Sequence, residues 1–175
     1  MSYIDQVKSV ESSLKEVKSD LICIGVYKDK SMTPAGNEVD ENLKKAIKSA
    51  MEVGDIKGKN GEVNLFYVNN QRYALIGLGK KENIDSNSIR LATGSAIRAA
   101  ISKKASTITL DCFCSELDSC QAMGEGAVLG SYQFLDHKTN DKNQFSINEV
   151  EVLNANKEQL DKGVAIGKAI CFARD

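Results

Sequence analysis

Short apolar runs that end in glycine or polar residues recur along the chain and predict buried strands. The clearest is 73–76 (YALI), which leads directly into Gly77-Leu78-Gly79. An apolar run closed by glycines is typical of a strand that is buried on both faces and ends in a tight turn. Leu21–Tyr27 has the same character. Further strands are expected at 3–9 as an edge, Val63–Val68, 107–112 and 147–153.

Apolar residues at helical spacing fill the segments between these strands. Thr33 and Pro34 predict the start of the first helix, with Thr33 as its cap and Pro34 where a missing N–H costs nothing. Gly54 is expected to end that helix. Three more helices are predicted: one capped by Asp85 or Ser86, one over 117–134, and one after Asn156 with Leu160, Gly163, Val164, Gly167, Ile170 and Cys171 on one stripe.

The order of these elements indicates the fold class. Asn69-Asn70 predicts a tight turn that pairs Val63–Val68 antiparallel to the following strand. About six strands alternating with four helices predict an α/β protein, specifically a three-layer α/β/α sandwich with a mixed sheet in a single domain over 1–175. Neither glycine nor proline ends the apolar stripe of the last helix, so we expect the chain to be part of a longer protein.

Composition and charge exclude several function classes. Lysine and arginine (23) nearly balance aspartate and glutamate (24), so bulk charge gives no case for binding nucleic acid or a membrane surface. No apolar run approaches the roughly 20 residues that span a bilayer. The first residues lack the pattern of a signal peptide. Five cysteines, an odd number with apolar neighbours, favour reduced thiols and a cytoplasmic location.

The segment Gly77–Lys81 has some features of a phosphate-binding loop. The dinucleotide fingerprint needs a third glycine where Glu82 stands, and Lys81 replaces the Ser or Thr of a nucleotide-triphosphate loop. An anion site formed by the turn amides and Lys80 is one interpretation. The favoured interpretation is that these glycines allow the chain to turn away from a central strand.

Candidate metal ligands and catalytic groups are sparse. Cys112 and Cys114, with Cys120 further on, lack the paired spacing of a zinc site, so packing in or near the core is favoured over metal binding. A Ser-His-Asp arrangement would have to use His137, the only histidine, and no Gly-x-Ser-x-Gly motif is present. Gly163-x-x-x-Gly167 indicates close helix packing. The residues alone therefore predict no catalytic, cofactor-binding or metal-binding residue.

Six short blocks, in order and spacing, carry a resemblance to a known family. They are Thr33-Pro34-Ala35, Gly58-Lys59-x-Gly61-Glu62, Ile76-Gly77-Leu78-Gly79-Lys80-Lys81, Gly126-Ala127-x-Leu129-Gly130-Ser131-Tyr132-x-Phe134, Lys138-Thr139 and Ala173-Arg174-Asp175. With these blocks the chain resembles the N-terminal domain of the leucyl aminopeptidases, from about residue 21 to the last residue.

The resemblance implies a macro-domain-like fold and a specific kind of parent protein. That parent would be a cytosolic, hexameric exopeptidase that removes N-terminal residues from peptides. Two divalent metals, zinc or manganese, would lie with their Asp, Glu and Lys ligands in a larger C-terminal domain. None of those ligand motifs occurs in this sequence, so no catalytic or metal residue is carried over. DNA binding, reported in some family members, is disfavoured for this domain by its near-neutral charge.

An alternative function belongs to a different class. A free-standing macro-like module could hold a phosphate-bearing ligand such as ADP-ribose at Gly77–Lys81. Only this one glycine-rich loop qualifies, whereas a macro domain normally needs two such loops and an early aspartate. The sequence therefore favours the non-catalytic aminopeptidase domain.

Overall fold

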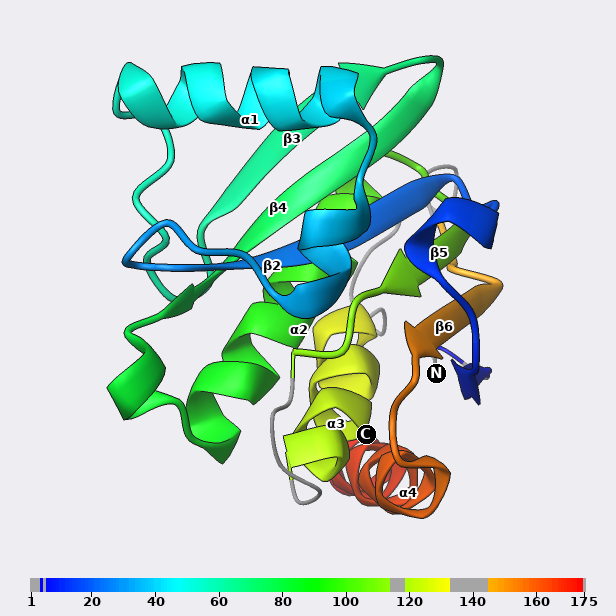
Figure 1. The fold of residues 1–175 in the computed structure, drawn as a ribbon. Coiled ribbons are helices and arrows are strands. Elements are labelled where there is room, and N and C mark those ends of the chain that lie inside the picture. The colour runs from blue at the N-terminus through cyan, green and yellow to red at the C-terminus, as the bar shows by residue number, and fades with distance from the viewer. Residues whose placement is uncertain (1–3, 5, 114–118, 133–144, 175) are drawn as a thin grey trace, which may run out of the picture.

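The computed structural model describes residues 4, 6–113, 119–132 and 145–174 and shows a mixed sheet with helices on both faces (Figure 1). The predictions for Cys114 and His137 lie outside the described residues. Elements labelled η are short 3₁₀ helices. In chain order the elements are β1 (Val7–Val10), η1 (Leu14–Glu16), β2 (Leu21–Tyr27), η2 (Pro34–Glu38), α1 (Glu41–Glu52), β3 (Val63–Val68), β4 (Gln71–Gly79), η3 (Lys81–Asn83), α2 (Ser86–Ser102), β5 (Thr107–Leu110), α3 (Ser119–Ser131), β6 (Glu149–Leu153) and α4 (Lys157–Arg174).

The six strands lie in the order β1-β6-β5-β2-β4-β3, and all neighbours are parallel except β3, which pairs antiparallel with β4. The predicted Asn69-Asn70 turn is confirmed. Both residues have positive φ, 52° and 60°, as the favoured two-residue hairpin turn requires. The predicted edge strand is β1, although it spans Val7–Val10 rather than 3–9.

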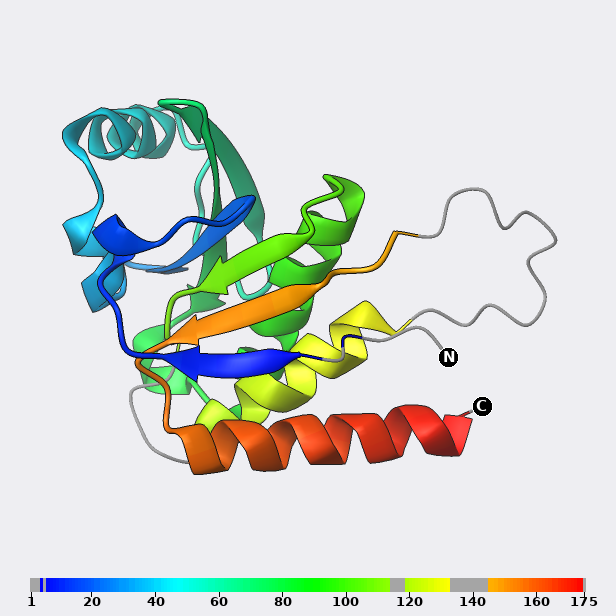
Figure 2. The ribbon, with the colours of Figure 1, turned by 90° about the vertical axis from the view of Figure 1, so that its right-hand side faces the viewer.

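Alternate residues of the central strands enter two separate cores. From β2, Leu21 and Cys23 join the core beneath α2 and α3, whereas Ile22 and Ile24 join the core beneath α1. Figure 2 shows α1 on one side of the sheet, and α2, α3 and α4 on the other. The predicted three-layer α/β/α sandwich is thereby confirmed, and continuous apolar runs such as Leu21–Tyr27 follow from burial on both faces.

The predicted start of the first helix is wrong. Thr33 and Pro34 begin the 3₁₀ helix η2, and the α-helix starts at Glu41. Asp40 is its cap, since Asp40 Oδ1 accepts a hydrogen bond from Leu43 N at 2.9 Å. Val39 between them is extended and 6% exposed, so the chain bends inward there to bury an apolar side chain. The predicted stop at Gly54 is confirmed by its φ of +86°.

The predicted caps of two other helices, which depend on residues close in sequence, are confirmed. Asp85 forms a capping box with Ser88 at the start of α2, and Asn156 Oδ1 accepts from Gln159 N at 3.0 Å at the start of α4. Two strand limits differ from the expectation: β5 ends at Leu110 rather than 112, and β6 begins at Glu149 rather than 147. The third helix, α3, ends at Ser131 rather than at 134, since Tyr132 is described and lies outside the helix, whereas the predicted start at 117 lies outside the described residues.

Helix α3 lies between α2 and α4 in backbone contact with both. A Cβ atom placed on Gly163 of α4 would lie 2.0 Å from the Gln121 carbonyl oxygen of α3. One placed on Gly126 of α3 would lie 2.6 Å from the Arg90 carbonyl oxygen of α2. The predicted close packing at Gly163 and Gly167 is confirmed, and it draws α3 and α4 together over the sheet.

This contact predicts that Gly163→Ala destabilises the protein. The new methyl group cannot fit without a backbone shift, so we expect the free energy of unfolding in urea to fall by about 2–3 kcal/mol. Gly94→Ala in α2 is the matched control. Its Cβ would lie 3.3 Å from the flexible end of Arg98 and 3.6 Å, an ordinary van der Waals distance, from the Gly126 carbonyl oxygen. Better helix propensity should therefore raise stability by up to about 1 kcal/mol. Equal effects of the two substitutions would contradict the packing account.

Candidate functional site

The best-placed candidate site is a crevice where the carboxyl ends of β2 and β5 meet. After β2 the chain passes to α1 on one face, and after β5 it passes to α3 on the other. Ligands of open α/β sheets bind at such a switch in connection direction. A cavity of about 400 Å³ opens there; it is lined by Ser12, Ser13, Leu14, Pro34, Ala35, Glu38, Asp111, Cys112, Leu153 and Asn154.

Asp111, the first residue after β5, forms the floor of this crevice and is 3% exposed. Its backbone N–H donates to the carbonyl oxygen of Cys23 at 2.9 Å. Its carboxyl group accepts from the backbone N–H groups of Gly25 and Cys112 and contacts the hydroxyl of Thr33. Asp111 therefore ties the end of β5 to β2 and to the start of η2.

This geometry shifts the pKa of Asp111. Burial raises the pKa of its carboxyl group to about 6, although the hydrogen bond with Thr33 acts in the opposite direction, and the charge of Glu38 adds to the rise. Thr33 Oγ1 also lies 3.2 Å from the carbonyl oxygen of Gly25. The carbonyl oxygen of Gly25 also accepts from Thr33 N at 3.1 Å, so the Thr33 hydroxyl can donate to Asp111 without leaving that carbonyl unpaired.

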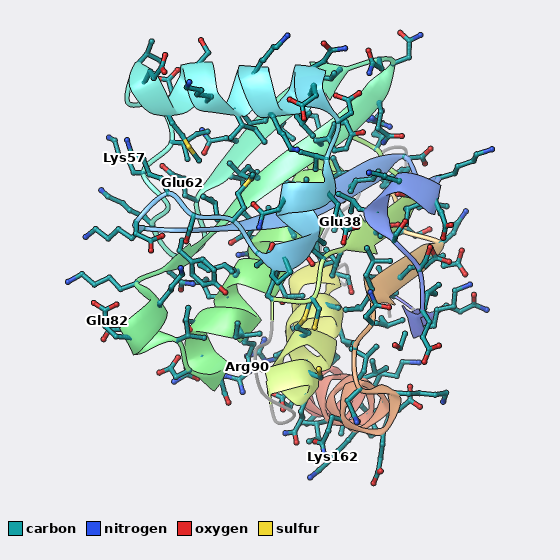
Figure 3. All side chains as sticks on the ribbon, in the orientation of Figure 1. Glu38, Lys57, Glu62, Glu82, Arg90 and Lys162 are labelled. Atoms are coloured by element: carbon teal, nitrogen blue, oxygen red, sulfur yellow. The ribbon has the colours of Figure 1, made fainter. Side chains whose placement is uncertain are left out.

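Charged and polar groups at the rim give the crevice an acidic character. Glu38 is exposed on η2 and is labelled in Figure 3. The Asn154 side chain is engaged with Ser12, accepting from its N–H at 3.3 Å and donating to its carbonyl oxygen at 3.1 Å. These contacts join the ends of β1 and β6, so the polar side chains observed here hold the fold together.

The glycines of Gly77–Lys81 serve backbone packing. Gly77 N donates to the Glu62 carbonyl oxygen at 2.8 Å, and Gly79 N donates to the Gly58 carbonyl oxygen at 3.0 Å. A Cβ on Gly77 would lie 1.9 Å from the Lys59 carbonyl oxygen, so only glycine lets the preceding loop approach β4. Since the amides of both glycines are already bonded, they are not available to a phosphate, which supports the structural interpretation.

The loop that packs on Gly77 is organised by one carboxylate. Glu62, labelled in Figure 3, accepts from the backbone N–H groups of Lys57 and Gly58 at 3.0 and 2.6 Å. On the other side of the turn, Lys81 Nζ lies 3.3 Å from Asp29 and 5.0 Å from the ring centroid of Tyr27. Glu62 and Lys81, at this end of β4, are therefore both engaged by groups of the protein.

Potential metal ligands do not gather in the described part of the chain. Cys23 and Cys120 are buried and Cys112 is half-buried, and burial raises the pKa of the Cys23 thiol far above its usual range. Among residues 4, 6–113, 119–132 and 145–174, no three His, Cys, Asp or Glu side chains are placed to hold a metal ion. The same residues contain no helix with the length and apolar character needed to cross a membrane.

Sequence reasoning missed Asp111 and the role of Thr33. It placed Asp111 inside a strand and Thr33 at a helix cap, whereas the two side chains meet across 78 positions of sequence. The sequence does contain a signal for Asp111, which is its position relative to a strand. Asp111 follows a buried strand directly, and polar residues at the carboxyl ends of adjacent parallel strands converge on one edge of the sheet.

Comparison with known proteins connects the chain to one family. The model of the N-terminal domain of the cytosol aminopeptidase family matches residues 23–141. A probable cytosol aminopeptidase of Alkaliphilus metalliredigens is 29% identical over 181 residues, covering 95% of this chain and 36% of that protein. The chain thus spans about a third of the length of this relative.

Two solved structures share the fold. A mutant of tomato leucine aminopeptidase superposes with a TM-score of 0.80 at 18% identity, covering 98% of this chain and 37% of that one. The macrodomain of Thermus aquaticus DarG has a TM-score of 0.59 at 12% identity, covering 85% of this chain and 98% of that one. The expected macro-domain-like architecture is therefore confirmed.

The raised pKa of Asp111 predicts a specific pH dependence of stability. Because the folded state binds this proton more tightly than the unfolded state, stability should fall as the pH rises from about 4 to 6, by up to about 3 kcal/mol. Asp111→Asn should remove this loss. The free energy of unfolding of the variant, measured in urea, should therefore increase relative to that of the wild type as the pH rises across this range.

Asp85→Asn provides a control, because the contribution of Asp85 to stability should change with pH in the opposite direction. Hydrogen bonds from Ser88 lower the pKa of Asp85, so its contribution to stability is lost as the pH falls. Parallel pH profiles for the wild type and Asp111→Asn would contradict a raised pKa of the buried Asp111 carboxyl group.

Proposed function

The chain belongs to the cytosol aminopeptidase family, and from this membership we propose that it is a non-catalytic N-terminal domain of a longer peptidase. One observation carries the proposal. The chain matches the N-terminal domain of the family and spans only about a third of its relative from Alkaliphilus metalliredigens. The parent would release N-terminal amino acids from peptides in the cytoplasm.

We place the chemistry of that parent outside residues 1–175. Two divalent ions, zinc or manganese, would supply a metal-bound water and hold the developing oxyanion. The described residues of this chain do not fit such a site, because no three metal-ligating side chains converge among them. The crevice residues support the same proposal, since the hydrogen bonds of Asp111 and Thr33 join strands within the fold.

The domain itself would act on assembly or on substrate access. We propose that 1–175 is a single domain, and that the parent forms a homo-hexamer in which this domain shapes subunit contacts or limits the length of peptides that reach the metals. Nucleic acid and membranes are not proposed as partners, because the formal net charge is −1.

Binding of a phosphate-bearing ligand such as ADP-ribose is the less supported function. It would need free backbone amides at Gly77–Lys81, but those of Gly77 and Gly79 donate to carbonyl oxygens of the preceding loop. Of the two lysines there, Lys81 is paired with Asp29. The cavity beside the turn also carries both signs of charge, since Asp29 and Glu82 line it with three lysines.

The proposal predicts that the purified chain does not hydrolyse a leucyl chromogenic substrate when manganese or zinc is added. A full-length cytosol aminopeptidase assayed in parallel serves as the positive control. Metal-dependent turnover that co-purifies with the 175-residue chain would overturn the proposal. Calorimetric titration with millimolar ADP-ribose tests the alternative: we expect no heat of binding, and saturable heat would favour the ligand-binding module.

A further inference from the structure

The strand β3 forms one edge of the sheet and is labelled in Figure 1. Among the described residues it pairs with β4 alone. None of the residues of Val63–Val68 is buried, whereas residues 74–78 of β4 all are. Tyr67 is 65% exposed. The side of β3 that faces away from β4 is therefore open to a further strand.

The register of the β3–β4 hairpin shows which backbone groups point to this open edge. In a two-residue hairpin the residues that flank the turn, here Val68 and Gln71, exchange both of their hydrogen bonds. Along an antiparallel pair, every second residue repeats this arrangement, and the residues between them direct their N–H and C=O groups outward. The outward residues of β3 are therefore Val63, Leu65 and Tyr67.

The outward groups of these three residues have no partner in the described chain. The same alternation continues before β3, since Gly77 N donates to the Glu62 carbonyl oxygen at 2.8 Å. Outside the β3–β4 ladder, no described residue forms a hydrogen bond with the backbone of Val63, Leu65 or Tyr67. A row of unpaired N–H and C=O groups is suited to pairing with another strand.

The opposite edge of the sheet is protected against such pairing. The strand β1 has only 4 residues, and its half-exposed Lys8 forms ion pairs with Glu149 and Glu151 of β6. Short strands and exposed lysines are the usual protection of a sheet edge. In contrast, β3 has 6 residues, VNLFYV, without charge, proline or glycine. This composition favours strand pairing.

We propose that β3 pairs with β3 of a second copy of this chain, antiparallel and about a two-fold axis at Leu65. In this register Leu65 lies opposite Leu65 of the partner subunit, and Val63 lies opposite Tyr67 of the partner subunit. Because the outward residues are evenly spaced, all their N–H and C=O groups find partners on the other strand. Since β3 carries no charge, the pairing brings no like charges together.

The side chains of β3 agree with this register. Val63 and Leu65 lie at the margin of the core beneath α2, whereas Phe66 and Val68 join the core beneath α1. Alternate residues share a face, so Tyr67 lies on the same face as Val63. In the pair, the exposed Tyr67 covers the half-buried Val63 of the partner subunit. Aromatic and β-branched side chains placed opposite each other stabilise a sheet.

A second copy is favoured over an unrelated peptide as the occupant. A free peptide loses its chain entropy when it is ordered as a strand, whereas β3 is already ordered by β4. The second copy also supplies an open edge of the same length and spacing. The inference rests on the proposed function for its role, since the pairing supplies one of the subunit contacts of a homo-oligomer. Stable interfaces involve about 20–30 residues on each side, so one strand pair should hold the isolated chain together only weakly.

Amide hydrogen exchange followed by NMR tests the proposal on the native chain. Exchange is compared at micromolar and millimolar protein concentration. We expect exchange of the Val63, Leu65 and Tyr67 amides to slow by about an order of magnitude at the higher concentration, because each gains a hydrogen bond. Unchanged exchange of these three amides overturns the proposal.

The amide of Ser9 on β1 is the matched control. Gln6 and Val10 accept from residues at the β6 side, so the alternate residue Ser9 directs its N–H away from β6. Its amide also lies at an edge of the sheet, but at the protected one. Exchange of this amide should be the same at both concentrations.

A variant pair tests the contact by sedimentation. Tyr67→Pro removes one outward N–H group, and proline is tolerated where an edge strand directs its N–H to solvent. Tyr67→Phe keeps both the N–H group and the aromatic ring. We expect Tyr67→Phe to dimerise as the wild type does, and Tyr67→Pro to weaken dimerisation by about tenfold or more. The exchange experiment needs no variant, so it decides the question if Tyr67→Pro does not fold.

The remaining outcomes are also decisive. A dimer that Tyr67→Pro does not weaken, with the three amides unprotected, would place the contact elsewhere and overturn the proposal. Slow exchange of these amides in the monomer at micromolar concentration would show that the chain covers its own edge, which also overturns it. Metal-dependent turnover by the chain would overturn the proposed function alone. Neither exchange nor sedimentation depends on catalysis, so the two proposals fail independently.

Discussion

Backbone contact at glycine is the constraint on which the arrangement of layers depends. Gly126 and Gly163 remove the side chains that would separate α3 from its neighbours, so three helices share one face of the sheet. Gly77 does the same at the end of β4, where the loop before β3 packs directly on the strand. Glycines that in sequence suggest a phosphate loop are thus required by packing, and their amides are used in the fold.

In the crevice at the carboxyl edge of the sheet, polar groups are likewise bonded within the fold. In an α/β protein this position often holds a ligand. Here its most buried carboxyl group, that of Asp111, joins two central strands and the start of η2 by accepting from Gly25, Cys112 and Thr33. This is consistent with the proposal that the reaction takes place in another part of a longer enzyme.

Local signals account for what the sequence predicted well. The Asn69-Asn70 turn, the caps Asp85 and Asn156 and the stop at Gly54 each depend on groups within a few residues. The errors involve distant partners. The Thr33 side chain makes no cap hydrogen bond, because its hydroxyl meets Asp111, the residue after β5. The sequence predicts Ile170 on the packing stripe of α4, yet it is 37% exposed, whereas Gly163, Gly167 and Cys171 of the same stripe are buried. Helical spacing alone cannot distinguish an inner apolar face from an outer one when both are apolar.

The size of the native polypeptide tests the central claim most directly, because that claim makes this chain one domain of a longer aminopeptidase. An antibody raised against the chain can be used to detect the protein in extracts of its own source cells. The account predicts a band at nearly three times the 19.0 kDa of this chain, the ratio set by the length of the Alkaliphilus metalliredigens relative. A single band at 19.0 kDa would contradict it.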